Sequence, residues 1–575
     1  MKGSWRRLEL ASGKIADRVI ETDVLIIGGG IGGCPAACKA AEHGLHVALL
    51  EKSKTERSGM TGQGLDEIGM YPRDGATVLD LVGRSSERSF DPNIRYRVLS
   101  NMFWALEELE RLGVSMRYLD GEFGWMPWHG MYSKDVGPKV QLRVHWQNVK
   151  PELAAAVRKR GVKVFDRTVV VDLLTDNGKV AGATAVNTRT GEFIVFKAKA
   201  VVIGTGGFIR HYEPPTPPCW KYKMAYNYPA ASMAGDGHAV AYRAGAELTG
   251  MEILETPGLR DMMLMQPGQL YMNDGILAKV FTWKGEELSG YRGPPHWAEY
   301  ERKGLTPFYH SLETLPDDFH KRIEIHIADE TMIRLKLDED RGFNPRTHRF
   351  QVSRPRGAHH MSGNIVIDEG LKTSLDGLYA IGECGGVGGG GGSSTAGLLV
   401  GDNIHKYVSE AGDPELDEGQ VESQKQAAMA PLAVKDLSDG IEPMELECTI
   451  RSICEEYAGP FKTEGMLREG LRRLGSLRRT FLPRLMAINP HYLLRCLEAR
   501  NILEMAELHL QACLERKETR RSSSRIIFVR LDYPKQDPSL NNRRLCQRLE
   551  KGKPVIDIRE IPDLKPEYAK ENKQN

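Results

Sequence analysis

The chain has 575 residues, and its 78 lysine and arginine residues almost balance its 77 aspartate and glutamate residues. This balance excludes a strongly basic surface of the kind that binds nucleic acid or anionic membranes. No stretch approaches the roughly 18 apolar residues of a membrane-spanning helix, so we expect no direct membrane insertion.

Nine cysteines are spread along the chain without a C-x-x-C pair or a ferredoxin-type series. We therefore expect neither an iron–sulfur cluster nor another metal site in this chain. The closest pair, Cys34 and Cys38, lies in a predicted helix where small residues pack. This pattern favours structural thiols in a reducing compartment and predicts a cytoplasmic protein.

Residues 23–53 have the pattern of a strand, a glycine-rich turn, a helix and a second strand. Gly28, Gly30 and Gly33 form a G-x-G-x-x-G motif, in which the second glycine lets a pyrophosphate approach the backbone. Glu51 ends the second strand and follows Gly33 by 51 − 33 = 18 residues, close to the ~20 expected for an acid that binds a ribose hydroxyl. This pattern predicts a dinucleotide site but does not choose between FAD and NAD.

Apolar periodicity after this unit predicts helices and a β-meander. The expected helices cover 93–112 and 151–160, and the expected strands cover 162–165, 169–174, 180–186, 193–196 and 200–207. Residues 250–355 are irregular and indicate an inserted domain, whereas residues 414–516 have helical periodicity.

Seven motifs occur in an order and spacing typical of one known family. They are 28–33, Glu51-Lys52, Arg57-Ser58, 204–207, 234–237, 377–383 and 530–534. Over roughly residues 20–540 the chain resembles the flavoprotein subunits of the fumarate reductase and succinate dehydrogenase family. That family includes L-aspartate oxidase and the adenylylsulfate reductase α subunit. The resemblance implies FAD as the cofactor.

The resemblance also implies an α/β fold: a Rossmann-like FAD-binding domain with an inserted α+β capping domain and a C-terminal helical domain. The expected boundaries are 1–250 and 356–412 for the FAD-binding domain, 251–355 for the capping domain, 413–530 for the helical domain and 531–575 for a C-terminal tail.

Two departures from the family pattern bear on the chemistry. Covalent members have Ser-His-Thr after the ribose acid, but this chain has Ser58-Gly59-Met60, which predicts noncovalent FAD. Fumarate and succinate enzymes carry an arginine in a Gly-Ala-Asn-Arg-Leu segment, but residues 385–401 contain no basic residue. Both departures resemble the adenylylsulfate reductase branch, as does Glu518-Thr519-Arg520, although residues 250–355 do not.

The resemblance implies a set of FAD contacts. The glycine motif would hold the pyrophosphate, and the segment from Ser393 to Leu398 would aim a helix N-terminus at the flavin pyrimidine. The predicted cofactor-binding residues are Gly28, Gly29, Gly30, Ile31, Gly32, Gly33, Glu51, Lys52, Ser58, Gly59, Thr205, Gly206, Gly207, Asp236, Glu383, Ser393, Ser394, Gly397 and Leu398.

The candidate catalytic residues are His359, His360, Arg354, Arg356 and Arg260. The two histidines begin a segment that resembles the family's His-x-Met-Gly-Gly, in which a histidine bonds the substrate beside the flavin. Cationic and hydrogen-bonding groups there would polarise an anionic acceptor. The alternative is a buried, satisfied histidine with solvated arginines, and for Arg260 a structural salt bridge. His238 is expected on a helix surface or beside the cofactor.

Three functions remain open at this point. The first is a catalytic subunit that moves two electrons between FAD and a small anionic substrate at a C–C bond. The second is an adenylylsulfate reductase α-like subunit that acts at sulfur, and the third is a non-catalytic electron-transfer scaffold. The family implies a separate iron–sulfur subunit, which could place the protein at a membrane periphery, whereas a dioxygen-using oxidase needs no such partner.

Overall fold

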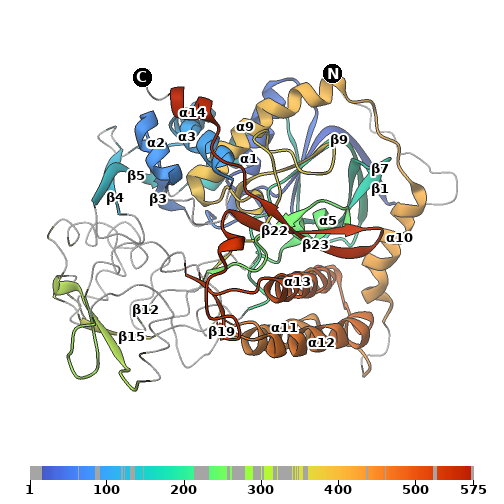
Figure 1. Cartoon of the computed structure of the whole chain (residues 1–575). Coiled ribbons are helices and arrows are strands. Elements are labelled where there is room, and N and C mark those ends of the chain that lie inside the picture. Colours follow the sequence, from blue (N-terminus) through green and yellow to red (C-terminus); the bar gives the residue numbers. More distant parts are fainter. Residues whose placement is uncertain are drawn as a thin grey trace.

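The computed structural model describes the chain at residues 16–62, 64–83, 91–117, 121, 123–129, 136–146, 148–212, 232–255, 260–261, 279–288, 300, 303–314, 317, 320, 340, 344, 346–347, 349–353, 360–434, 438–459, 461–521 and 527–571. A central sheet with helices on its faces occupies one part of the molecule, and a helical layer lies beside it (Figure 1).

The central sheet has the strand order β6-β2-β1-β9-β8-β7, and β18 pairs with the end of β9. Strands β6, β2, β1, β9 and β18 are parallel, whereas β7 and β8 are antiparallel additions. Their bounds are β1 (Arg18–Ile27), β2 (Val47–Glu51), β6 (Lys163–Asp166), β7 (Thr168–Asp176), β8 (Lys179–Asn187), β9 (Phe193–Ile203) and β18 (Leu378–Ala380).

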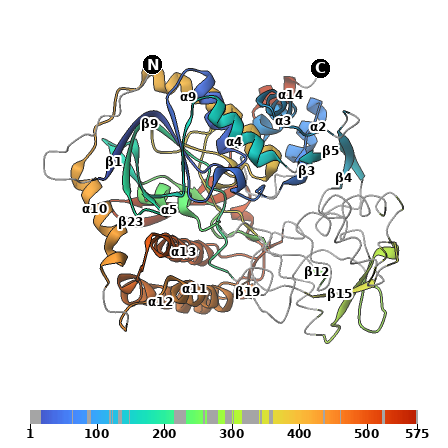
Figure 2. The ribbon, with the colours of Figure 1, turned by 180° about the vertical axis from the view of Figure 1, so that it is seen from behind.

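The apolar runs of β1 and β9 place both strands in the middle of the sheet. Residues 24–27 are almost completely buried because helices cover the sheet, so no polar alternation appears in the sequence. Helix α9 (Gly389–Glu410) packs against α1 (Gly33–Glu42) and α3 (Pro92–Leu112), and α1 also packs against α4 (Val149–Lys159). Figure 2 shows α4 beside the central sheet, on the same side as α9 in that view.

The predicted β-meander is present, with one difference. The sequence predicts separate strands at 193–196 and 200–207, but these segments form the single strand β9. Lys197 and Lys199 are only half-buried and alternate with buried alanines, so they lie on one partly exposed face of a continuous central strand and do not mark a break. The β7–β8 turn uses Asn177 and Gly178 with positive φ, as a tight hairpin requires.

The inserted region contributes small antiparallel sheets. Strands β12, β15, β14 and β13 form one sheet in that order, and β11 pairs with β16 where the chain leaves and returns. A third small sheet, formed by strands that precede the inserted region in the chain, has the order β3-β5-β4. The bounds are β3 (Leu65–Met70), β4 (Gly124–His129), β5 (Val136–Trp146), β11 (Leu254–Glu255), β12 (Arg260–Asp261), β13 (Lys279–Phe281), β14 (Phe308–Ser311), β15 (Arg349–Ser353) and β16 (His360–Met361), with α2 at Gly75–Gly83.

The helical region matches the predicted periodicity. It consists of α10 (Glu418–Met429), α11 (Pro443–Tyr457), α12 (Glu464–Thr480) and α13 (Pro490–Glu515). Helices α11, α12 and α13 pack on one another, and α13 contacts α5 (Asp236–Arg243) below the sheet. The buried Arg530 side chain donates to the carbonyls of Cys513, Leu514 and Arg516 at the end of α13. It therefore satisfies acceptors that a helix end leaves open.

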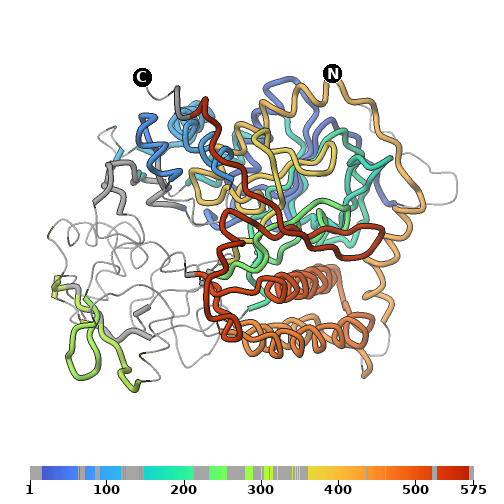
Figure 3. Tube along the Cα trace, in the orientation of Figure 1, coloured from blue at the N-terminus to red at the C-terminus, as the bar shows by residue number. Residues whose placement is uncertain are grey.

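Residues 531–575, expected as a tail, are folded over most of their length. Strands β22 (Arg543–Glu550) and β23 (Lys553–Glu560) form a hairpin that joins β10 (Leu248–Thr249) and β17 (Asn364–Ile365). Helix α14 (Pro566–Glu571) then reaches α3, where the rings of Tyr568 and Tyr96 stack at 4.3 Å. Figure 3 shows this path in red. Three short strands, β19 (Phe461–Lys462), β20 (Arg520–Arg521) and β21 (Ile527–Arg530), form a separate sheet.

A buried ion network joins the central sheet to the helical layer. Arg210 pairs with Glu447 at 2.7 Å and with Glu498 at 2.6 Å, and Lys52 pairs with Glu498 at 2.8 Å. Burial alone would raise the pKa of the Glu498 carboxyl. The charges of Lys52, Arg210 and Arg495 outweigh burial and hold this pKa at about 2. Glu498 therefore remains ionised at neutral pH between two regions of the fold.

We predict that Glu498→Gln lowers the free energy of unfolding at neutral pH by about 3–5 kcal/mol, because buried cations lose their partner. The folded pKa lies below the ~4.3 of an unfolded glutamate, so this contribution is complete above roughly pH 5 and is lost as the pH falls toward 2. Urea unfolding near pH 7 and near pH 3 measures the effect. Exposed Glu515→Gln is the control. An equal deficit of Glu498→Gln at both pH values would contradict the assignment.

Candidate cofactor and substrate site

Two loops meet at the carboxyl ends of β1 and β9. Gly28 has a φ of +105°, and its N–H donates to the carbonyl of Leu50 at 2.8 Å. A β-carbon at Gly28 would lie 2.4 Å from the carbonyl oxygen of Gly204, and one at Gly33 would lie 1.8 Å from that of Gly28. A side chain at either position would therefore break the contact of backbone with backbone.

Gly30 is different from these two positions. A β-carbon there would have no heavy atom nearer than 4.0 Å, so the space beside it is open. The helix α1 begins three residues later without a side-chain cap and without an acidic residue in its first turn. The N–H of Cys34 already donates to the Gly30 carbonyl at 3.1 Å and Pro35 has no N–H, so the N–H groups of Gly32 and Gly33 and the positive dipole end of the helix can serve an anion.

The peptide of Gly29 is held from both sides. Its N–H donates to Glu51 Oε2 at 2.9 Å, and its carbonyl accepts hydrogen bonds from Ser58 Oγ at 3.0 Å and from the ammonium of Lys150. Lys150 is fully buried and also lies 3.6 Å from the Cys34 thiol, whose pKa is raised by burial. These side chains fix the loop in the shape that leaves Gly30 open.

Lys150 is a site residue that sequence reasoning missed. It lies on α4 between buried Val149 and Leu153, so it is a charged residue inside an apolar helical stripe. That interruption of the stripe was the available signal.

Glu51 also accepts hydrogen bonds through Oε1 from the N–H and hydroxyl of Ser53, at 2.8 and 2.9 Å. A carboxylate has about four lone-pair positions, so a ribose hydroxyl can still bond to it.

Helix α9 crosses the glycine loop at close range. A β-carbon at Gly397 would lie 2.1 Å from the carbonyl oxygen of Gly32, and one at Gly32 would lie 2.9 Å from that of Ser393. The helix begins at Gly389 without a side-chain cap or an early acidic residue. The predicted contacts Ile31, Ser393, Ser394 and Leu398 are all buried in this region.

The loop after β9 is braced by Glu383. Its Oε2 accepts from the N–H of Gly207 at 2.8 Å, and Thr205 Oγ1 accepts from the N–H of Gly237 at 3.2 Å. Gly206 and Gly59 both have positive φ, near +75°. The structure thus brings four of the predicted segments, around residues 30, 59, 206 and 383, to the same ends of the central strands.

Lys52 and Asp236 lie together, but they bond each other. Lys52 Nζ lies 2.6 Å from Asp236 Oδ2, and Asn501 donates to Asp236 Oδ1 at 2.8 Å. Both side chains therefore belong to the network that joins the sheet to α13, and their contact with the cofactor remains a prediction. His238 lies not on a helix surface but buried in α5, with Nε2 at 3.1 Å from the Gly363 carbonyl oxygen.

The catalytic candidates are only partly visible. Arg354, Arg356 and His359 lie outside the described residues. The backbone of His360 is in β16 opposite Glu255 of β11, and that of Arg260 is in β12 opposite Ser353 of β15. His360 therefore lies where the chain returns from the inserted region. Within the described ranges, no group of three or more His, Cys, Asp or Glu side chains is arranged to hold a metal ion.

The residues present fit a dinucleotide. The open space at Gly30 accepts a pyrophosphate, and the uncapped start of α1 supplies its donors. The long glycine-lined approach of α9 gives a second uncapped helix N-terminus in the same region. FAD bound there would supply the two-electron chemistry, whereas the protein supplies position and electrostatics.

We predict that Gly30→Val and Gly33→Ala fail for different reasons. Gly30→Val should keep the fold but lose FAD, because its side chain enters the open space where the pyrophosphate lies. Gly33→Ala should lose stability first, because its β-carbon collides with the Gly28 carbonyl. Circular dichroism and flavin absorbance per protein after gel filtration separate the two outcomes. Wild-type FAD content in a folded Gly30→Val protein would remove the assignment.

Two family models match the chain. The model of the FAD binding domain covers residues 23–264, and that of the fumarate reductase flavoprotein C-terminal region covers residues 448–566. The first contains the glycine loop and Glu51, and the second contains α12, α13 and the C-terminal hairpin. In the described part of the chain, no helix is long and apolar enough to cross a membrane.

Named relatives match along almost the whole chain. A fumarate reductase flavoprotein subunit of Haemophilus influenzae is 24% identical over 96% of both chains. A fumarate reductase (CoM/CoB) subunit of Methanothermobacter marburgensis is 26% identical over 92% of this chain and 97% of the relative. L-aspartate oxidase of Yersinia pestis is 25% identical over 90% of this chain and 96% of the relative.

Solved structures show the same fold. Adenylylsulfate reductase from Archaeoglobus fulgidus superposes with a TM-score of 0.78 at 24% identity, covering 95% of this chain and 96% of the other. A quinol fumarate reductase of E. coli superposes with a TM-score of 0.74 at 20% identity, covering 95% of this chain and 98% of the other. These matches confirm the predicted fold class and the FAD cofactor. The chain is an FAD-dependent oxidoreductase that is similar, along most of its length, to the flavoprotein subunits of fumarate reductase and succinate dehydrogenase.

Proposed function

We propose that this protein is the catalytic flavoprotein subunit of a redox enzyme that moves two electrons between noncovalent FAD and a small anionic substrate. The open space at Gly30 inside an otherwise closed glycine loop carries this proposal, because it leaves room for the pyrophosphate of a dinucleotide. The capping region and the FAD-binding domain meet at the β11–β16 pair. Substrate binding there would exclude water from the flavin.

The electrons are exchanged with an iron–sulfur partner subunit. Two observations support this part of the proposal. The cysteine pattern provides no cluster in this chain, and named relatives such as the fumarate reductase flavoprotein of Haemophilus influenzae are subunits. The protein then acts in the cytoplasm, and contact with a membrane is made through the partner. L-aspartate oxidase offers the alternative in which dioxygen accepts the electrons.

A second candidate is sulfur chemistry of the adenylylsulfate reductase type. It is favoured by residues 385–401, which lack the arginine of fumarate and succinate enzymes, and by Glu518-Thr519-Arg520. In the structure, Glu518 is buried between Arg516 at 2.5 Å and Arg520 at 2.8 Å. Both arginines therefore donate to Glu518, which is a structural role and leaves the substrate to be decided by experiment.

We predict that the flavin is released by denaturation. Covalent relatives carry a histidine where this chain has Gly59, and the neighbouring Ser58 hydroxyl already donates to the Gly29 carbonyl. Without a side chain at residue 59, nothing at that position can bond the isoalloxazine. After acid or heat precipitation, all yellow colour should be in the supernatant. Flavin that stays with the precipitated polypeptide would refute noncovalent binding.

The reaction is tested with photoreduced protein mixed with fumarate, adenylyl sulfate or dioxygen. Rapid reoxidation of the flavin by one of these assigns the acceptor. Arg356→Ala and His360→Ala should slow that reoxidation by about 10²-fold, the scale of losing one transition-state hydrogen-bond donor. Reduction of the oxidised flavin by an artificial dye should stay nearly unchanged, because the flavin site is intact.

Arg189→Ala is the matched control, because Arg189 is exposed on the β8–β9 loop. It should leave all rates unchanged. Equal losses with dye and substrate would show that Arg356 and His360 are structural. If no acceptor reoxidised the wild-type flavin faster than buffer, the proposed class of substrate would be wrong.

A further inference from the structure

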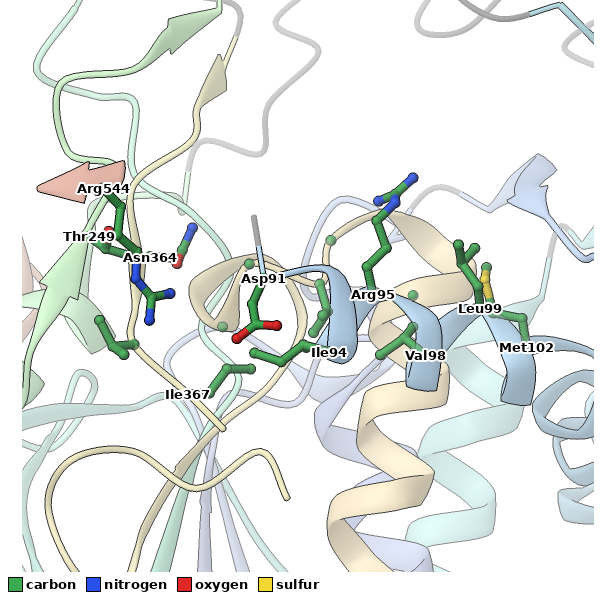
Figure 4. Close-up of a pocket in the computed structure, with 16 residues that line it drawn as sticks. Asp91, Ile94, Arg95, Val98, Leu99, Met102, Thr249, Asn364, Ile367 and Arg544 are labelled. Atoms are coloured by element: carbon green, nitrogen blue, oxygen red, sulfur yellow. The ribbon is translucent and has the colours of Figure 1, made fainter. Parts of the chain in front are cut away.

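A cavity of about 120 Å³ lies between α3, the glycine run before α9, strand β17 and the C-terminal hairpin (Figure 4). Its wall contains the apolar side chains Ile94, Val98 and Ile367 and the charged side chains Asp91, Arg95 and Arg544. None of the residues predicted to bind cofactor or substrate lines it. The cavity is therefore a candidate for a separate small-molecule site.

Arg544 is the unusual residue of the C-terminal hairpin. Its three arginine neighbours all have carboxylate partners: Arg543 pairs with Glu560, Arg548 with Asp557 and Arg559 with Glu247. Arg544 Nε is buried, and no hydrogen bond or ion pair of its side chain exists among the described residues. Buried donors of this kind are normally satisfied, so the Nε–H of Arg544 calls for an acceptor.

Asp91 supplies the opposite charge. Its Oδ1 accepts a hydrogen bond from the N–H of Asn93 at 2.9 Å and so caps α3. Figure 4 shows the Asp91 carboxylate and the Arg544 guanidinium both pointing into the cavity from different walls. No ion pair joins them in the part of the chain that the structure describes. A cation and an anion thus face the same space without neutralising each other.

The volume limits the ligand. A cavity of about 150 Å³ holds benzene, which has six non-hydrogen atoms, so this cavity of about 120 Å³ holds a molecule of roughly four to six non-hydrogen atoms. The apolar wall from Ile94, Val98 and Ile367 suits a short carbon chain. A ligand with a single charge would pair with either Arg544 or Asp91 but not with both. A carboxylate that also carries a hydrogen-bond donor matches both.

We propose that this cavity binds a small carboxylate bearing an amino or hydroxyl group, of the α-amino acid or 2-hydroxy acid class. Its carboxylate pairs with Arg544, its amino or hydroxyl group donates to Asp91, and its carbon chain packs on Ile94 and Val98. Planar guanidinium groups bind carboxylates through two parallel hydrogen bonds, which fixes the orientation of the ligand. This site goes beyond the proposed redox reaction and does not depend on it.

The test is calorimetric titration of the FAD-loaded full-length protein with L-alanine, L-lactate, propionate and isopropylamine. L-alanine or L-lactate should bind with saturation at one site per chain. Propionate lacks the donor and isopropylamine lacks the carboxylate, so each should bind at least fivefold more weakly. Arg544→Met should weaken binding at least tenfold, because a charge-assisted pair is lost. Asp91→Asn keeps an effective helix cap, and it should reduce the difference in affinity between L-alanine and propionate.

Arg543→Met is the matched control, since Arg543 is exposed on the same strand. This variant should bind L-alanine and L-lactate with the affinity of the wild-type protein. Circular dichroism and FAD content verify that each variant is folded, and if Arg544→Met is not folded, Arg544→Lys and Asp91→Asn carry the test. Absence of binding by all four probes would overturn the proposal, as would equal affinities in the Arg544 and Arg543 variants. Arg356→Ala, in which turnover should fall, should retain binding, so the two proposals can fail separately.

Discussion

The packing of backbone against backbone at Gly28 is the constraint on which the site depends. Gly28, Gly33 and Gly204 lie so close that a β-carbon at Gly28 or Gly33 would overlap a carbonyl oxygen. This contact fixes the ends of β1 and β9 and the start of α1 relative to one another. Gly30 alone stays open, because Glu51, Ser58 and Lys150 hold the intervening Gly29 peptide. The cofactor site is thus a gap in a tightly closed loop.

Buried charge links this site to the rest of the fold. Lys52 follows Glu51 directly and pairs with Asp236 and Glu498, so the loop after β2 is tied to α5 and α13. Arg210 continues the network to Glu447 of α11. Breaking such pairs leaves an isolated charge in a medium of low polarity, which is costly. The helical layer therefore supports the FAD-binding domain through specific pairs as well as through apolar packing.

The sequence predicts most of the fold because the local residue patterns favour the same helices and strands that the folded structure contains. The glycine motif, the β-meander and the helices of residues 414–516 all depend on short-range periodicity. The C-terminal hairpin was missed because β22 is rich in arginine and because Arg559 of β23 pairs with the distant Glu247. Lys150 was missed because its partner atoms among the described residues, the Gly29 carbonyl and the Cys34 thiol, lie more than a hundred residues away along the chain. The local signal, a lysine inside an apolar helical stripe, does not identify these distant partners.

A crystal structure of the purified yellow holoprotein tests the central claim most directly. The account predicts that the FAD diphosphate lies over Gly30 and accepts hydrogen bonds from the backbone N–H groups at the start of α1. The Gly29 peptide should keep its bonds to Glu51, Ser58 and Lys150. A diphosphate bound away from this loop, or a flavin attached covalently to the chain, would contradict the account.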